Sequence, residues 1–521
     1  MKLKVLLVVF VGCIATVVAT AQNKLTVDKV YSAQLKNSGS IIGDGQVKGY
    51  FLFYQSDKVD KKTNEYTLSI LDQNLNKVKE IKFTDSKDVQ LMEAAYNGNA
   101  LSFLFHNKKE KIFESRVYGF DGKLKFTYTK ELDKKSEEYL KQLELMRGDN
   151  EDATNDEVFS VADKGFATII PLRDGKLHTY ELEYYSSESR KQWAFNPNDE
   201  EHWASAVFLG ATDSIIVLEV SKKDRAMSGK TTASIIGLNY ETKKKVFELD
   251  GSKDKFNFVP QYCTKLENSS NLLFMGSYFS KTDDIVRDFS QGLAIYIISP
   301  TGQVVSSTYN SWAKDIGKYV NLNEKGKIDD IGYLFFHNII QSSNGKLFAV
   351  GEGYKRVADA AGIAVNALSM LGGRVNGGGN TKIKVTDMVI LQFTPDYKIA
   401  GATIQQKNSN SFHTMYADLN SQHALALYVK ALGGFDYAFT TADKEVNSFA
   451  ICYNDYERSS DYKGETFHTM RYNGTKFSND KLELASKASS LKVFPAKPGS
   501  VMIMEYFKKE KRLNLRLEKV N

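Results

Sequence analysis

The chain alternates between apolar and polar segments in a pattern that repeats along its length. Each copy has an apolar strand, a polar loop, a second strand, a tight turn and a more polar third strand. β-Branched and aromatic residues fill these strands, and turn residues flank them, which is typical of β-hairpins. The second strands of successive copies begin at or near Tyr66, Ser115, His178, Ala233, Leu293, Asp387, Thr466 and Leu513. The sequence therefore predicts a repeat protein built from antiparallel sheets.

Several features of the repeat indicate how the sheets pack. Three predicted turns, Asp121-Gly122, Thr301-Gly302 and Asn473-Gly474, suit the positive φ angles of tight hairpins. Some partner strands, such as residues 215–218 and 501–504, are apolar throughout. A strand that is covered on both faces does not need to alternate apolar and polar residues. We therefore expect each sheet to lie between two neighbouring sheets.

The spacing of the copies predicts a ring. The shortest spacings are about 45 to 49 residues, which fits a propeller blade of 40–50 residues. Because one blade cannot bury both of its faces, blades stack in a circle. We predict an all-β fold, a seven- or eight-bladed β-propeller, with residues 423–430 and 435–440 as strands of a further or an adjacent blade. Two tandem β-sandwiches are the alternative fold.

The last copy predicts how the ring closes. It ends at Asn521, which leaves no room for an outermost strand. Residues 24–35 are a spare strand candidate near the start of the chain. We predict that the N-terminal strand pairs with the C-terminal hairpin and covers its edge.

Two segments that interrupt the repeat predict short helical insertions. Residues 133–147 are charged and carry Tyr139, Leu140, Leu143 and Met146 at helical spacing. Residues 356–373 are small and apolar and end at glycines, which favours a helix with a stop. We expect the first helix to lie across the rim of the ring or to dock a partner. The second would pack on one face, cap the central channel or dock a partner.

The first residues predict export. Lys2 and Lys4 precede an apolar run over residues 5–18, and Ala19-Thr20-Ala21 is a small-x-small cleavage pattern. The run is too short to span a bilayer as a helix. We expect residues 1–21 to be a signal peptide and residues 22–521 a single propeller domain in the periplasm or outside the cell, without a transmembrane anchor. Lipidation at Cys13 is the alternative.

Composition narrows the function classes. With 42% hydrophobic and 12% aromatic residues, the chain is an ordered, core-forming protein. The formal net charge of +6 comes from scattered lysines and not from a concentrated basic face, so we expect no nucleic-acid partner. Cys263 and Cys452 would remain after export, and we expect each to be buried as an apolar residue rather than paired.

The rhythm of the blades resembles that of secreted bacterial β-propeller proteins. The resemblance covers most of the mature chain. The sequence has no run of Trp-Asp blade ends, no kelch double glycines and no S-x-D-x-G-x-x-W aspartate box. The resemblance therefore implies a propeller and assigns no activity to particular residues.

Candidate chemistry is sparse. The sequence has no H-E-x-x-H, G-x-S-x-G or phosphate-loop motif, and we predict no metal site, cofactor or catalytic residue. Residues 193–203 combine indole faces, which suit sugar rings or peptides, with oxygen atoms that suit Ca²⁺. A carboxylate pair in a hairpin loop suits acid–base work if a pocket raises one pKa. The candidate ligand-binding residues are Trp193, Asp199, His202, Trp203, Asp283 and Asp284.

These observations favour a non-catalytic propeller that binds a protein, peptide or glycan. The alternatives are a secreted hydrolase or lyase with a site in the central channel, and a structural subunit of a periplasmic or outer-surface assembly. Convergence of three or more carboxylates or histidines from different blades at one channel mouth would favour the enzyme.

Overall fold

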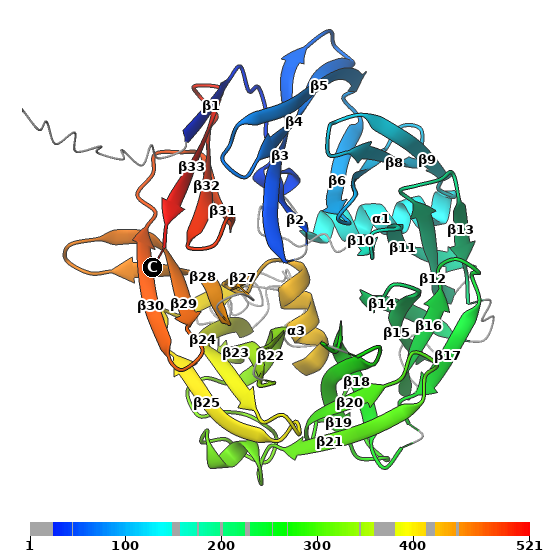
Figure 1. Cartoon of the computed structure of the whole chain (residues 1–521), viewed down its shortest axis with the longest axis vertical. Coiled ribbons are helices and arrows are strands. Elements are labelled where there is room, and N and C mark those ends of the chain that lie inside the picture. The colour runs from blue at the N-terminus through cyan, green and yellow to red at the C-terminus, as the bar shows by residue number, and fades with distance from the viewer. Residues whose placement is uncertain are drawn as a thin grey trace, which may run out of the picture.

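A computed structural model shows eight β-sheets arranged in a ring (Figure 1). Within each sheet consecutive strands pair in chain order, except that the last sheet takes its outer strand from the start of the chain and one sheet carries a fifth strand paired with its third; all pairings are antiparallel. The structure describes residues 24–43, 45–147, 157–174, 177–197, 202–223, 230–252, 254–267, 269–342, 345–358, 381–412, 422–443 and 447–520. We number the sheets as blades 1 to 8 in chain order.

The first four blades occupy the first half of the chain. Blade 1 contains β2 (Gly39–Gly43), β3 (Gln46–Lys58), β4 (Thr63–Asp72) and β5 (Lys77–Ser86). Blade 2 contains β6 (Val89–Tyr96), β7 (Ala100–Asn107), β8 (Ile112–Gly119) and β9 (Leu124–Glu131). Blade 3 contains β10 (Val158–Val161), β11 (Gly165–Asp174), β12 (Leu177–Ser186) and β13 (Gln192–Phe195). Blade 4 contains β14 (Trp203–Ala211), β15 (Ile215–Lys223), β16 (Thr231–Asn239) and β17 (Lys245–Asp250).

The remaining blades complete the ring. Blade 5 contains β18 (Asn257–Lys265), β19 (Leu272–Phe279), β20 (Gly292–Ile298) and β21 (Val304–Ser311). Blade 6 contains β22 (Tyr333–Gln341), β23 (Leu347–Ala358), β24 (Thr381–Phe393), β25 (Ile399–Gln405) and β26 (Asn410–Phe412). Blade 7 contains β27 (Tyr437–Asp443), β28 (Ser448–Arg458), β29 (Lys463–Tyr472) and β30 (Phe477–Glu483). Blade 8 contains β31 (Ser490–Pro495), β32 (Ser500–Phe507), β33 (Arg512–Lys519) and β1 (Lys24–Asp28).

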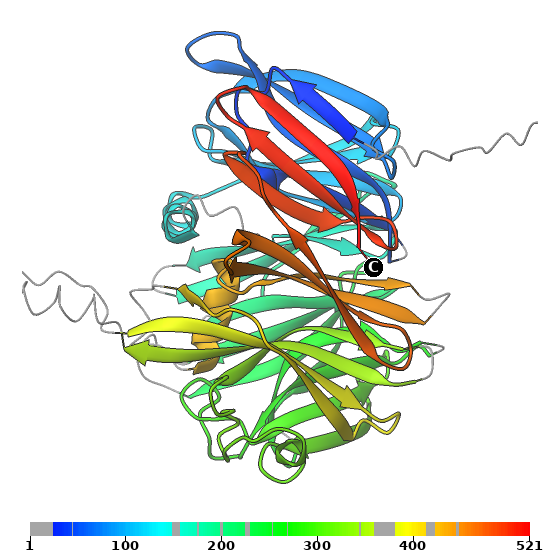
Figure 2. The same cartoon turned by 90° about the vertical axis from the view of Figure 1, so that its left-hand side faces the viewer.

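The prediction of an all-β propeller of seven or eight blades is confirmed, with eight blades. The alternative of two tandem β-sandwiches is wrong, because the sheets stand side by side around one ring (Figures 1 and 2). A cluster of buried apolar side chains fills each interface between neighbouring blades. The core therefore lies between the blades and not inside any one of them.

The middle strands of the blades explain the unbroken apolar runs. Every residue of β19 and of β20 is buried, whereas the first four residues of the outer strand β21 are exposed. The middle strands are covered by a neighbouring blade on each face, so they have no wet face on which to place polar residues. The polar third strand of each repeat is the outer strand of its blade.

The ring closes as predicted. Strand β1 pairs antiparallel with β33, from Lys24 opposite Arg516 to Asp28 opposite Arg512. The two ends of the chain thus share one blade, in which the N-terminal strand covers the outer edge of β33.

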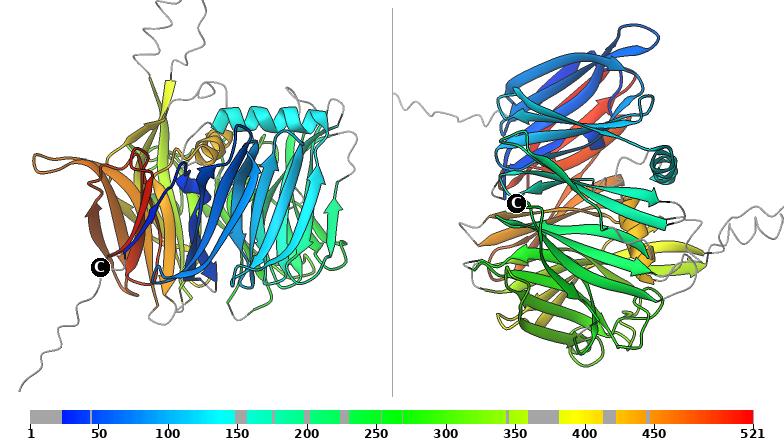
Figure 3. Two further views of the ribbon diagram at one scale, coloured as in Figure 1. Left: turned by 90° about the horizontal axis from the view of Figure 1, so that it is seen from above. Right: turned by 90° about the vertical axis from the view of Figure 1, so that its right-hand side faces the viewer.

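Two α-helices occur in the described part of the chain, α1 (Lys134–Arg147) and α3 (Gln422–Ala431). Both lie toward the same face of the ring, and α3 stands in its central opening (Figures 1 and 3). Two short 3₁₀ helices, η1 (Leu35–Asn37) and η2 (Ile316–Lys318), lie in connections. No helix among the described residues is both long and apolar enough to cross a membrane.

Helix α3 corrects one prediction. Residues 423–430 were expected to form a strand, but they are helical and bury Leu425, Ala426 and Val429 on one face. The helix ends at a glycine pair, where the N–H groups of Gly433 and Gly434 donate to the carbonyls of Lys430 and Val429.

Two other predictions fall outside the described residues. They are the signal peptide over residues 1–21 and most of the helical insertion predicted over residues 356–373, since β23 ends at Ala358 and β24 begins at Thr381. Cys263 and Cys452 are free and buried, as expected from the sequence.

Candidate functional site

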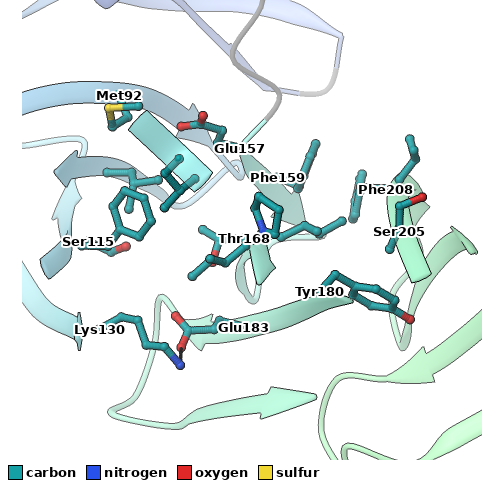
Figure 4. Close-up of a pocket in the computed structure, with 18 of the residues that line it drawn as sticks. Met92, Ser115, Lys130, Glu157, Phe159, Thr168, Tyr180, Glu183, Ser205 and Phe208 are labelled. Atoms are coloured by element: carbon teal, nitrogen blue, oxygen red, sulfur yellow. Dashed lines mark ion pairs between the residues drawn. The ribbon is translucent and has the colours of Figure 1, made fainter. Parts of the chain in front are cut away.

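A cavity of about 550 Å³ lies among blades 2, 3 and 4 (Figure 4). We call it the inter-blade cavity. Its apolar lining includes Leu104, Phe113, Tyr128, Ile170 and Phe208. Volumes of this size and apolar linings of this kind are typical of small-molecule sites. The cavity is the strongest candidate for a binding site in the described part of the chain.

Helix α1 forms one wall of the inter-blade cavity. Leu140 lines the cavity and belongs to the core cluster that joins blades 2 and 3. Asp133 caps the helix, because its Oδ1 accepts the N–H groups of Lys135 at 2.9 Å and Ser136 at 3.1 Å. The buried Glu137 pairs with Lys111 of the β7–β8 turn, Nζ to Oε2, at 2.9 Å. The cap and the ion pair together hold α1 against the ring.

Helix α3 forms the wall on the channel side. Its buried face packs Leu425, Ala426 and Val429 against blade 6. Leu427, Lys430 and Ala431 line the inter-blade cavity instead. Leu427 is 42% exposed, and its side chain faces the cavity. The cavity is therefore bounded by blades on one side and by an inserted helix on the other.

One end of the inter-blade cavity carries a cluster of charges. Lys130 of β9 pairs with Glu181 of β12. Its Nζ also lies 3.2 Å from Oε1 of Glu183 on the same strand (Figure 4). Glu183 is 7% exposed, and burial raises its pKa while the Lys130 charge opposes that rise. Burial lowers the pKa of Lys130, but the hydrogen bond to Glu181 and the nearby Glu183 outweigh it and raise the pKa. One ammonium group thus serves two carboxylates.

Glu157 contributes a carboxylate to the cavity lining away from this cluster. Glu93 of β6 accepts the N–H groups of Glu157 and Val158, the latter at 2.9 Å. These bonds hold the start of β10 beside blade 2 and place Glu157 in the cavity lining (Figure 4). Acceptors therefore occur at both ends of an apolar space.

A second cluster of buried charges lies where blade 6 meets blade 7. Glu352 of β23 is 0% exposed and accepts the N–H groups of Asp436 and Tyr437, at 3.2 Å and 3.1 Å. Lys407 Nζ lies 3.0 Å from Glu352 and also pairs with Asp436. Nε2 of His337 lies 3.3 Å from Glu352 Oε2. The four residues form what we call the Glu352 cluster.

The pKa shifts in the Glu352 cluster follow from burial and pairing. Burial alone would raise the pKa of Glu352, but Lys407 and His337 hold it below its usual range. Burial raises the pKa of Asp436, which shares Lys407 with Glu352. Burial also lowers the pKa of His337, whose ring stacks on Tyr437 at 4.6 Å between centroids. The cluster fastens the segment after α3 to blade 6.

A larger cavity, of about 870 Å³, adjoins the Glu352 cluster. Asp436 and His337 line it, together with Asp455 of β28 and Lys492 of β31. Lys430 of α3 lines both this cavity and the inter-blade cavity, so the helix separates the two. Polar groups make up more of the lining here than in the inter-blade cavity.

The structure separates the two tryptophans predicted to bracket a site. The ring of Trp193 stacks on Tyr184 at 5.4 Å, and its Nε1 donates to the carbonyl of Tyr240 at 2.8 Å. The ring of Trp203 contacts His178 at 4.2 Å. His178 and Tyr184 are six residues apart on β12, which is roughly 20 Å along a strand. The indoles therefore face different surroundings.

The other predicted residues take structural positions or lie outside the description. Asp199 lies outside the described residues, and His202 is partly exposed just before β14. Asp283 accepts the N–H of Ser280 at 2.8 Å, and Asp284 accepts that of Val286 at 2.9 Å. The two carboxylates thus stabilise their own loop between β19 and β20. No group of three or more His, Cys, Asp or Glu suited to a metal ion occurs among the residues described.

Comparison with known proteins places the chain in a family. Residues 1–521 match the model described as Family of unknown function (DUF6770). The chain belongs to this family. No curated protein matches the sequence.

Solved structures that resemble the chain do so distantly. The WD40 domain of SCAP from fission yeast is 8% identical, with a TM-score of 0.37 over 95% of this chain and 94% of that one. The β-propeller domain of the Trilobed protease from Pyrococcus furiosus is 11% identical, with a TM-score of 0.30 over 74% and 95%. Synechocystis ACO, in its cobalt-substituted form, is 9% identical, with a TM-score of 0.28 over 52% of this chain and 60% of that one. This chain thus spans less than two thirds of the length of that last protein, and none of these similarities bears on function.

The sequence-based prediction did not include the charged residues of either cluster, although the strand patterns around them contain signals. Glu181 and Glu183 alternate with Tyr180, Leu182 and Tyr184, so both glutamates point to one face of a mostly buried strand. Glu352 interrupts a buried strand, and a charge at such a position requires a partner. Which strand supplies the partner is set by the packing of blades.

Proposed function

We propose that this protein is an exported, non-catalytic propeller that binds a peptide or protein segment through the inter-blade cavity. The observation that carries the proposal is a largely apolar space of about 550 Å³ among blades 2, 3 and 4, which side chains of helices α1 and α3 also line. A ligand that fills this space packs against the apolar walls and removes their surface from water. Rigid walls from three blades suit recognition without reorganisation.

A glycan ligand is less favoured by the geometry. The sequence placed two indoles around one stretch of carboxylates, but Trp193 and Trp203 contact opposite ends of β12. A sugar ring stacked between the two tryptophans would need both indole rings at the same site. The aromatic side chains that do border one space, among them Phe113 and Phe208, line the inter-blade cavity.

A binding measurement with a neutral apolar probe tests the proposal. N-phenyl-1-naphthylamine should bind the mature protein with micromolar affinity and increased fluorescence. Ala206 lines the cavity on β14, so Ala206→Trp should fill it and weaken binding at least tenfold. The matched variant Ala442→Trp, on the inner strand β27, should bind as the parent does. Absence of binding, or equal binding by both variants, would contradict the proposal.

One observation favours the alternative of a hydrolase or lyase. Asp436 and His337 belong to the Glu352 cluster and border the cavity of about 870 Å³, and burial raises the pKa of Asp436. A carboxyl group that keeps its proton toward neutral pH serves as a general acid. Turnover of a glycoside or ester by the mature protein, abolished in Asp436→Asn while the fold is retained, would establish this activity. Lys407 already pairs with both Asp436 and Glu352, and this engagement favours the binding function instead.

A further inference from the structure

We infer that the inter-blade cavity selects ligands that carry a positively charged group on an apolar body. This inference rests on the proposed function, because it names the ligand class of the same cavity. The juxtaposition behind it is one ammonium group, on Lys130, shared by the carboxylates of Glu181 and Glu183, and of these two carboxylates Glu183 lines the apolar space. A ligand cation would supply the charge that this cluster lacks.

The charge balance at the cluster is negative. The side chains of Lys130, Glu181 and Glu183 are 29%, 15% and 9% exposed, so water screens them weakly. Charges interact more strongly where water is excluded, and a buried charge without full compensation is costly. Burial raises the pKa of Glu183, which is the direction expected for the less compensated of the two carboxylates.

The other titratable groups around the cavity do not correct this balance. Lys130 is the cation that lowers the pKa of Glu183, and Glu181 acts in the opposite direction. Glu157 adds a carboxylate elsewhere in the lining, and His178 has its pKa lowered by burial and by Arg173. Lys430 projects from α3, where its charge acts on His337 of the Glu352 cluster. The lining near Glu183 therefore favours a cation.

The walls specify the rest of the ligand. Leu104, Phe113 and Ile170 lie in the lining with the carboxylates, so an alkyl or aryl group fits beside the charged end. Aromatic rings also attract cations at their faces. The shared chemistry is an ammonium on an apolar chain, which occurs both in small amines and in the basic side chain of a peptide.

Three phenylalkyl probes of similar length and different charge test the charge preference. They are 4-phenylbutylamine, 4-phenylbutan-1-ol and 4-phenylbutyrate, measured against the mature protein by calorimetry at pH 6 and pH 8. The amine should bind at least tenfold more tightly than the alcohol, and the acid should bind most weakly. The preference should not weaken from pH 6 to pH 8, because the deprotonated form of Glu183 favours a bound cation.

Variants separate the charge from the cavity. Glu183→Gln should reduce the affinity for the amine about tenfold and leave that for the alcohol unchanged. The matched variant Glu188→Gln, on the exposed loop that follows β12, should change neither. Lys130→Met removes the competing ammonium and should strengthen amine binding if the variant folds. N-acetyl-phenylalanyl-lysine amide distinguishes the sources, since tighter binding than 4-phenylbutylamine assigns the cation to a peptide.

The outcomes distinguish this inference from the function on which it rests. Equal binding of amine and alcohol in the parent, or an unchanged amine affinity in Glu183→Gln, would overturn the charge preference while the cavity remains a binding site. Failure of all three probes to bind would overturn the proposed function and the inference together.

Discussion

At the scale of single residues, buried charges connect parts of the chain that are distant in sequence. Glu137 of α1 pairs with Lys111 of blade 2, and Glu352 of blade 6 accepts backbone N–H groups of the segment after α3. Each of these carboxylates has lost water and gained donors in its place. Each carboxylate has more than one partner, because Glu137 also pairs with Lys141 and Glu352 also pairs with Lys407.

Glu219 is a buried carboxylate that predicts a pH dependence of stability. It is 8% exposed on β15, where burial raises its pKa from the ordinary 4.5 to about 7 and a hydrogen bond from Ser221 opposes that rise. The folded protein holds this proton more tightly than the unfolded chain does. The stabilisation is therefore complete below about pH 4.5 and is lost as the pH rises through about 7. In Glu219→Gln the loss is absent, so the variant should be more stable than the parent at pH 8 by about 1–3 kcal/mol.

Thermal or urea unfolding of the two proteins at pH 5 and pH 8 checks this prediction. The advantage of Glu219→Gln should shrink at pH 5, where the parent carboxyl group is protonated in the folded state. Glu241→Gln, at an exposed position in the turn before β17, should show no pH-dependent difference. An equal effect of Glu219→Gln at both pH values would contradict the assignment.

At the scale of elements, the hairpin turns join neighbouring blades as well as neighbouring strands. Gly302 has a φ of +87° in the β20–β21 turn, and its N–H donates to the carbonyl of Ser299 at 2.9 Å. A Cβ at this position would lie 2.2 Å from Cβ of Phe247, on the outer strand of the preceding blade. The turn thus needs glycine both for its backbone conformation and for the close approach of blades 4 and 5.

Gly302→Ala should therefore destabilise the protein by about 2–4 kcal/mol, since the strain of the left-handed backbone adds to the overpacking against Phe247. Gly45→Ala is the matched control, because Gly45 has a φ of +72° and a Cβ there would meet no atom within 4 Å. It should cost about 1–2 kcal/mol, from the backbone alone. Chemical denaturation measures both, and equal losses would show that the contact with Phe247 contributes nothing.

The elements that sequence patterns misassign are those whose state depends on their surroundings. Residues 423–430 contain Leu, Tyr and Val, which suit a strand, together with Ala and Lys, which suit a helix. Their apolar residues meet blade 6 only in the helical arrangement, in which Leu425 and Val429 lie on one face. The glycine pair after the helix, Gly433-Gly434, is the local sequence signal that indicates a helix end and not a strand end.

At the scale of the whole molecule, the closing strand determines whether the ring is complete. Leu25 and Val27 of β1 pack on the core cluster between blades 8 and 1, and the N–H of Val30 donates to the carbonyl of Lys511 at 2.8 Å. Without β1, the outer edge of β33 would present unpaired backbone groups to other molecules.

A chain that begins at Lys29 should therefore melt several degrees lower than one that begins at Lys24 and should self-associate. Differential scanning fluorimetry and size-exclusion chromatography of the two proteins provide the comparison. A shortened chain with an unchanged melting temperature and a monomeric profile would show that closure by β1 contributes little to stability.

The sequence by itself determined the repeat, the turns and the closure, because each depends on short-range rules. Strand propensity, glycine at positive φ and a missing outermost strand are all visible within one copy of the repeat. The tertiary structure alone decided the inter-blade cavity, the sharing of Lys130 by Glu181 and Glu183, and the Glu352 cluster. These features join residues from different blades and inserted helices, and their partners depend on how the sheets pack against one another. A single strand shows which of its faces carries a charge, but only the assembled ring shows what that charge meets.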